Sequence, residues 1–151
     1  MALNRRQWMR AAALLGAAGV FLSTSLRALA VSRPAFEATG VDDGIAKLFG
    51  DKPVEESDRI SFQIPDIAEN GAVVPVTVTS DLEGVTTISI VVDRNPNPVV
   101  ARFIIGPDAM ADVSARIKMG ESSRVRAFVE TADRVYSTGR EVKVTIGGCG
   151  G

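Results

Sequence analysis

The chain contains a single cysteine, Cys149, which is third from the C-terminus. It has glycines on both sides, in the sequence Gly147-Gly148-Cys149-Gly150-Gly151. A thiolate is nucleophilic and its sulfur is polarizable, so a cysteine can form persulfide, disulfide and thiosulfonate-type bonds reversibly. The glycines remove neighbouring side chains and leave the backbone free to adopt many conformations. Five extended residues reach about 17 Å, so we interpret this segment as a flexible arm that brings a thiol into narrow active sites.

The sequence argues against catalysis by the chain itself. Histidine does not occur in it, which excludes a Ser-His-Asp triad, a Cys-His pair and a histidine-ligated metal site. Cys149 has no neighbouring base in the sequence, and a mobile tail does not hold reacting atoms in line. One thiolate also provides too few ligands for a metal. We therefore expect a substrate carrier with no catalytic residue, no metal and no cofactor.

Three other interpretations of the tail are open. A glycine-rich C-terminus is often only disordered. The thiol could instead form an intermolecular disulfide, which would make the protein a structural or disulfide-linked binding subunit. Gly150-Gly151 would also suit a C-terminal thiocarboxylate, the group that ubiquitin-like sulfur carriers use. We prefer the carrier hypothesis because an exposed free thiol in an oxidising compartment is a liability unless it is used.

The first 30 residues have the three-part layout of an export signal. The pair Arg5-Arg6 precedes an uncharged stretch from Ala11 to Leu22, and Ala28-Leu29-Ala30 then provides a small-x-small cleavage site. The apolar stretch is shorter than the roughly 20 residues that a membrane-spanning helix needs. The paired arginines resemble a twin-arginine signal. We expect cleavage before Val31, export to the periplasm by the twin-arginine pathway, and no membrane attachment afterwards.

Net charge limits the classes of partner. Four of the 17 basic residues and none of the 18 acidic ones fall within positions 1–30, which leaves the mature chain with 13 basic residues and a net charge near −5. No basic cluster of the kind that binds nucleic acid remains. A single cysteine forms no internal disulfide, so packing must stabilise the fold.

After the signal, apolar residues are spaced first as in a helix and then as in strands. From Ala35 to Leu48 they recur on one helical face, and Gly50 ends this pattern before a linker. From Arg59 onward apolar residues alternate with polar ones, which indicates strands with one buried face. The predicted organisation is a signal at 1–30, helix and linker at 31–58, a β-sandwich at 59–146 and the arm at 147–151.

The alternating segment divides into seven sets, separated by turn sequences such as Asn70-Gly71 and Gly106-Pro107. Their number and spacing predict an all-β fold, an immunoglobulin-like antiparallel β-sandwich with a short N-terminal helix. A small closed barrel is the alternative. The sets begin at Ile60, Val74, Ile88, Ala101, Val113, Val125 and Val142.

Five apolar residues do not fit the alternation. Singly, each is ordinary exposed apolar surface; as a set, they could form a face that meets another subunit. The sequence does not decide between these two interpretations. The five are Val73, Val91, Val99, Ile104 and Phe128.

Four segments carry a resemblance to a known family. They are the C-terminal Val142–Gly151, the early strand region Ile67–Val76, and the middle segments Asp93–Pro98 and Arg116–Met119. Together they resemble SoxY, the sulfur-carrier family of the periplasmic Sox sulfur-oxidation system. The resemblance extends over roughly Phe36 to Gly151, nearly the whole mature chain.

The resemblance implies a fold, a function and a set of partners. The fold of the family is an immunoglobulin-like sandwich, and its members form a heterodimer with a second subunit, SoxZ, and are exported with it. A cytochrome pair, SoxAX, oxidatively joins thiosulfate to the tail cysteine. SoxB hydrolyses the terminal sulfonate to sulfate, and a sulfane dehydrogenase, where present, oxidises the remaining sulfur. Carried over by position, Cys149 bears the adduct, and the arm consists of Gly147, Gly148, Gly150 and Gly151.

Overall fold

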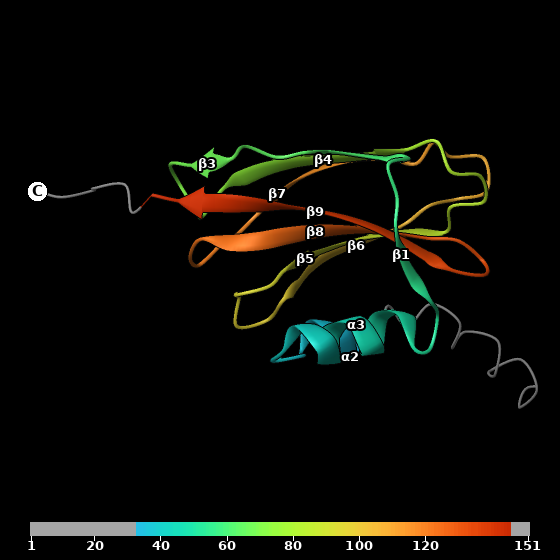
Figure 1. Cartoon of the computed structure of the whole chain (residues 1–151), viewed down its shortest axis with the longest axis horizontal. Coiled ribbons are helices and arrows are strands. Elements are labelled where there is room, and N and C mark those ends of the chain that lie inside the picture. The colour runs from blue at the N-terminus through green and yellow to red at the C-terminus, as the bar shows by residue number, and fades with distance from the viewer. Residues whose placement is uncertain (1–32, 146–151) are drawn as a thin grey trace, which may run out of the picture. The chain divides into compact units, whose positions relative to one another are not determined.

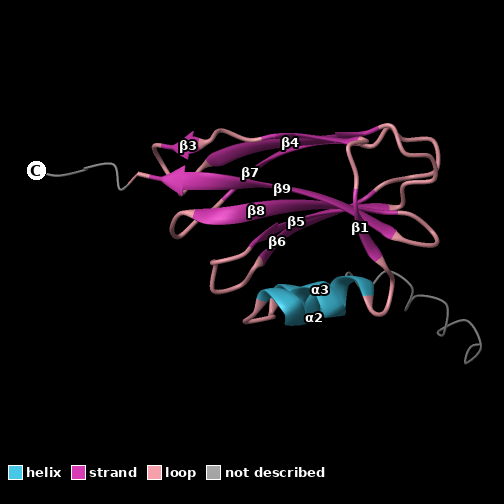
Figure 2. Ribbon diagram, in the orientation of Figure 1, coloured by secondary structure: helices cyan, strands magenta, loops and turns pink. Residues whose placement is uncertain are grey.

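Two β-sheets face each other, and two short helices cover the outer surface of the larger sheet (Figures 1 and 2). The computed structural model describes residues 33–145, so the predicted signal (1–30) and arm (147–151) lie outside the described residues. In chain order the elements are α2 (Arg33–Phe36), α3 (Val41–Phe49), β1 (Val54–Glu56), β2 (Ile60–Gln63), β3 (Ile67–Ala68), β4 (Val74–Ser80), β5 (Thr87–Val92), β6 (Val99–Ile104), β7 (Asp112–Ile117), β8 (Ser123–Glu130) and β9 (Val135–Val144).

Strand β9 pairs with three strands of the larger sheet. The order of this sheet is β1-β9-β8-β5-β6, and β3 also pairs with β9. The β9–β8, β8–β5 and β5–β6 pairs are antiparallel, whereas β1 and β3 run parallel to β9. These two short strands pair with opposite ends of β9: Val54 lies opposite Val135, and Ala68 lies opposite Val144. Between them the chain crosses to the smaller, antiparallel sheet, whose order is β2-β4-β7.

The core lies between the two sheets and is formed by the residues that alternate in the sequence. All seven predicted sets coincide with strands of the structure, so the prediction of an all-β sandwich is confirmed. Fully buried side chains come from both sheets, since valine and isoleucine pack well on a pleated surface. They include Val74 and Val78 of the smaller sheet and Ile88, Ile90, Val125 and Val129 of the larger sheet.

A second apolar cluster lies between α3 and the outer face of the larger sheet. The ring of Phe49 lies 5.3 Å from that of Phe128, measured between centroids, and Val91 and Val99 are buried beside them. Gly44 allows this close approach, because a Cβ atom at its position would lie 3.1 Å from Val99 Cγ2. For Val91, Val99 and Phe128, neither sequence interpretation was right: the protein's own helix covers them.

The remaining two out-of-phase residues, Val73 and Ile104, are exposed. The predicted helix is present but broken, because Gly40 adopts an extended backbone conformation between α2 and α3. The segment expected as a linker contains β1, and β9 begins at Val135, several residues before the expected start of the last strand. At these positions the sequence does not alternate between apolar and polar residues. Both strand segments form because they pair with neighbouring strands.

Candidate functional site

The predicted attachment residue, Cys149, and the four arm glycines lie outside the described residues. The structure does describe the point from which they extend, the end of β9 (Figure 1). We call residues Lys143–Thr145, with the segments that bind them, the arm base. The arm base ends at the last described residue, four positions before Cys149.

Strand β3 holds one edge of the arm base. The Lys143 N–H donates to the Asp66 carbonyl oxygen at 2.9 Å, and the Thr145 N–H donates to the Ala68 carbonyl oxygen at 3.0 Å. The parallel pairing of β3 with β9 therefore continues to the last described residue. Because Ala68 is buried in the sandwich core, β3 itself is anchored.

The Ser122 hydroxyl holds the other edge. Strand β8 pairs with β9 only as far as Ser123, opposite Val142, so the next residues of β9 lack a β8 backbone partner on that side. The Val144 N–H donates instead to Ser122 Oγ at 2.9 Å. A hydroxyl here satisfies a backbone donor whose burial without a partner would be costly.

The turn that follows β3 packs directly against the end of β9. Asn70 Oδ1 accepts the Ala72 N–H at 2.9 Å, and the Gly71 carbonyl oxygen accepts the Met119 N–H at 2.7 Å. A Cβ atom at Gly71 would lie 2.5 Å from the Met119 carbonyl oxygen and 2.9 Å from Val144 Cγ1. Glycine is therefore required here by close approach of two backbone segments.

Asn95 connects two further loops beside the arm base. Its amide nitrogen donates to the Lys118 carbonyl oxygen at 2.7 Å, and its Oδ1 accepts the Gly120 N–H at 3.0 Å. The Arg94 N–H also donates to Ser123 Oγ at 3.0 Å. These bonds fix the β5–β6 and β7–β8 connections at the end where β9 stops.

Among residues 33–145 there is no group of three or more side chains of the kinds that hold a metal ion. None of the helices described is long and apolar enough to cross a membrane. A recess of about 610 Å³ lies at the opposite end of the sandwich and is lined in part by Leu82, Val85, Pro107 and Met110.

Sequence reasoning identified the thiol but not the residues that fix its point of departure. It marked Asn70-Gly71 only as a turn, and it assigned no role to Ser122 or Asn95. An Asn-Gly pair just before a strand was the available signal for the turn. The Ser122 contact depends on where β8 ends, which no local pattern in the sequence gives.

Fold and site define a class: an all-β sandwich whose last strand, anchored on both edges, continues into a short glycine-cysteine segment. Residues 45–149 match the family described as "Sulfur oxidation protein SoxY". The chain therefore belongs to the SoxY family. The matched region includes Cys149 and ends there.

A solved structure supports the assignment. The chain is similar to the sulfur carrier protein SoxY from Chlorobium limicola f thiosulfatophilum, with 44% sequence identity and a TM-score of 0.64. The similarity covers 70% of this chain and 96% of that one. No curated protein sequence matches the chain.

Proposed function

We propose that this protein is a non-catalytic carrier that binds sulfur substrates covalently through Cys149 and presents them to partner enzymes. The observation that carries the proposal is that the family match runs to the only cysteine, five residues beyond the end of β9. The anchored arm base supports it, since a carrier needs a defined point from which the thiol extends. The similar protein from Chlorobium limicola is itself a sulfur carrier, which supports the same role.

Loading forms one bond and releases two electrons. The Cys149 thiol gives up its proton, the sulfane sulfur of thiosulfate bonds to Sγ, and an oxidised cytochrome accepts both electrons. The product is the thiosulfonate Cys149-S-S-SO₃⁻. Water then attacks the terminal sulfonate, and the bond between the sulfane and sulfonate sulfurs breaks. Sulfate and a proton leave, and a persulfide remains on Cys149.

The partners follow from this chemistry and from the family. A SoxZ-like subunit forms a heterodimer with the chain, and a SoxAX cytochrome, a SoxB hydrolase and a sulfane dehydrogenase act on the arm in turn. The Arg5-Arg6 signal directs the folded protein to the periplasm by the twin-arginine pathway. There the thiol meets inorganic sulfur compounds outside the reducing cytoplasm.

Intact mass of the mature protein, purified from cells grown on thiosulfate, tests the proposal. We expect a mass increase that matches a thiosulfonate or persulfide, that dithiothreitol removes, and that Cys149→Ser abolishes completely. The conservative variant Thr145→Ser, at the arm base, should retain the adduct. Thiosulfate-dependent respiration should be lost only with the cysteine substitution.

Other outcomes identify the alternatives. An increase located on the C-terminal carboxyl group, unaffected by Cys149→Ser, indicates a thiocarboxylate. A dimer mass that dithiothreitol halves, with no smaller adduct, indicates a disulfide-linked subunit. If Cys149→Ser leaves respiration unchanged, the carrier proposal is wrong.

A further inference from the structure

Strand β7 is an edge of the smaller sheet, and one of its sides pairs with no other strand of the described chain. The order of that sheet is β2-β4-β7, so β7 pairs with β4 alone. The other edge strand, β2, lies beside β9. An unpaired edge exposes backbone N–H and C=O groups that can continue the sheet into another chain. The smaller sheet is therefore open at β7.

The pairing with β4 determines which backbone groups of β7 point outward. The Ser80 N–H donates to the Ala111 carbonyl oxygen at 2.9 Å, and hydrogen-bonded and non-hydrogen-bonded pairs alternate along an antiparallel ladder. By this alternation, Ser114 and Arg116 turn their N–H and C=O groups to the open side. Pro75, which has no N–H to donate, lies opposite Arg116, which agrees with a pair that exchanges no hydrogen bond.

The exposed side chains of β7 carry a charge pattern that is complementary to itself. They are Asp112, Ser114 and Arg116. Neither Asp112 nor Arg116 forms an ion pair with another side chain of residues 33–145. The two opposite charges lie two positions before and two positions after Ser114. A second copy of β7, running antiparallel and centred on the same serine, would therefore match each charge with its opposite.

We propose that two copies of the chain associate through β7, in an antiparallel pair centred on Ser114. Each Asp112 then lies directly opposite Arg116 of the second copy, and the two Ser114 residues exchange backbone hydrogen bonds. The contact has two-fold symmetry, and the smaller sheets of the two copies become one continuous sheet. The proposal goes beyond the carrier function and does not depend on it.

The same side of the sandwich has apolar side chains that a second copy would cover. Strand β6, the edge of the larger sheet, comes close to β7. Ala101 and Phe103 of β6, and Val113 and Ala115 of β7, pack against the core but are only partly buried. In the proposed register Val113 lies opposite Ala115 of the second copy. Further burial of these side chains favours association.

The proposed pairing also determines where the two arm bases lie. Strand β7 runs toward the arm base, since the Met119 N–H, just after β7, donates to the Gly71 carbonyl oxygen at 2.7 Å. The β7 strand of the second copy runs in the opposite direction, so its arm base lies at the other end of the dimer. Each copy therefore presents its own arm base separately.

Sedimentation equilibrium of the mature chain tests the proposal, with dithiothreitol present to reduce any disulfide through Cys149. The variants are Asp112→Arg and Arg116→Asp, each measured alone and then mixed in equal amounts. The control is Arg140→Asp, because Arg140 is an exposed arginine of β9 and its substitution changes the net charge as Arg116→Asp does. Circular dichroism checks that each variant is folded.

We expect the wild type and Arg140→Asp to dimerise equally well. Asp112→Arg and Arg116→Asp should each weaken self-association about 25-fold, because two attractive pairs become repulsive and each reversal is worth roughly fivefold. Mixing these two variants should restore dimers, because arginines on one chain then meet aspartates on the other.

Three results would overturn the proposal. One is a wild type that stays monomeric up to about 1 mM, which leaves the β7 edge to a different partner, such as a SoxZ-like subunit. The others are a single variant, Asp112→Arg or Arg116→Asp, that dimerises like the wild type, and a mixture of folded variants that stays monomeric. The carrier function stands in each case, since the adduct on Cys149 tests it separately.

Discussion

The two ends of the sandwich are held by different kinds of interaction. At the arm base, uncharged groups fix β9: the backbone of β3 on one edge and the Ser122 hydroxyl on the other. At the opposite end, where β8 leads into β9, charged side chains predominate. Glu130, whose side chain is 10% exposed, binds Lys52 Nζ at 2.7 Å and Arg102 Nη2 at 3.1 Å through its carboxylate.

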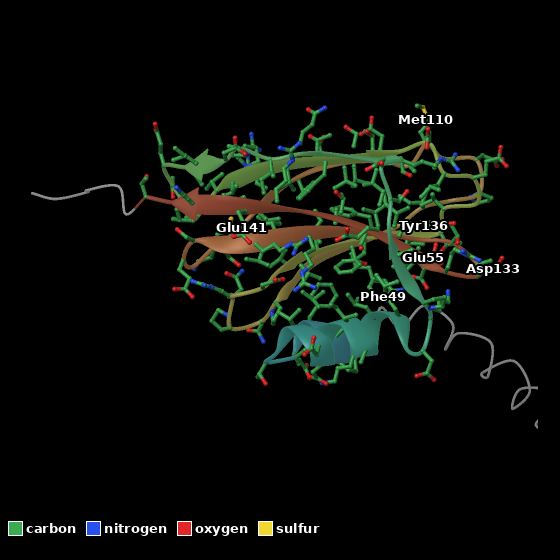
Figure 3. All side chains as sticks on the ribbon, viewed as in Figure 1. Phe49, Glu55, Met110, Asp133, Tyr136 and Glu141 are labelled. Atoms are coloured by element: carbon green, nitrogen blue, oxygen red, sulfur yellow. The ribbon has the colours of Figure 1, made fainter. Side chains whose placement is uncertain are left out.

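The charged end also carries exposed ion pairs and the large recess. Arg59 pairs with Asp81, and Arg134 pairs with Glu55. Figure 3 shows Glu55, Asp133 and Met110 toward this end, whereas Glu141 of β9 lies toward the arm base.

The two kinds of interaction stabilise different parts of the fold. The charged end joins the helices to the sheet, since Arg102 also donates to the Leu48 carbonyl oxygen near the C-terminus of α3, where a cation is favourable. The arm-base end holds the last described residues of β9 by neutral hydrogen bonds, and its β5–β6 loop also holds the ion pair between Arg126 Nη2 and Asp93 Oδ2, at 2.6 Å. Neutral hydrogen bonds are not screened by salt as exposed ion pairs are, so the arm base keeps its geometry as ionic strength changes.

The largest effect is expected at the charged end. Glu130→Ala removes the carboxylate that Lys52 and Arg102 share and should lower the free energy of unfolding by about 3 kcal/mol. Urea denaturation measures it. The control is Glu55→Ala, which breaks the exposed pair with Arg134 and should cost less than about 1 kcal/mol. Equal losses for the two variants would contradict the distinction between the buried and exposed ion pairs.

A somewhat smaller effect should come from overpacking the arm base. Gly71→Ala places a methyl group against the Met119 carbonyl oxygen and Val144 Cγ1, and should lower the free energy of unfolding by about 2 kcal/mol. Gly106→Ala, in the loop after β6, meets no atom within 4 Å and should leave stability unchanged or raise it by up to about 1 kcal/mol. Urea denaturation of the two variants compares the ends directly. A tolerated alanine at Gly71 would show that this turn is not packed as described.

Much of the sandwich could be predicted from sequence because its signal is local. Alternation such as Val74, Val76 and Val78 predicts a strand with one buried face wherever the strand pairs, and Asn70-Gly71 and Gly106-Pro107 marked turns correctly. The thiol was also evident, because a lone cysteine among glycines needs no structure to be noticed. Its role as an attachment site is still a prediction.

The rest depends on contacts between distant residues. Phe128 and Val91 break the alternation because α3, far earlier in the chain, covers them. The first half of β9 carries Gly139, which resembles a strand breaker, yet a Cβ there would lie 2.9 Å from Arg124 Nε. The small residue accommodates a cross-strand arginine. Such requirements become visible only after the strands have been paired.

The smallest predicted effect isolates one hydrogen bond of the arm base. Ser122→Ala removes the acceptor of the Val144 N–H and should lower stability by about 1 kcal/mol, the usual net contribution of one hydrogen bond. Amide hydrogen exchange at Val144 should accelerate about fivefold, because a local opening no longer breaks that bond. Ser114→Ala is the matched control: its hydroxyl pairs with the Thr77 hydroxyl, at 2.9 Å, on the smaller sheet, so exchange at Val144 should not change. If Val144 exchanges equally slowly in both variants, β3 alone holds the end of β9, and the two-edged anchoring argued for the arm base is wrong.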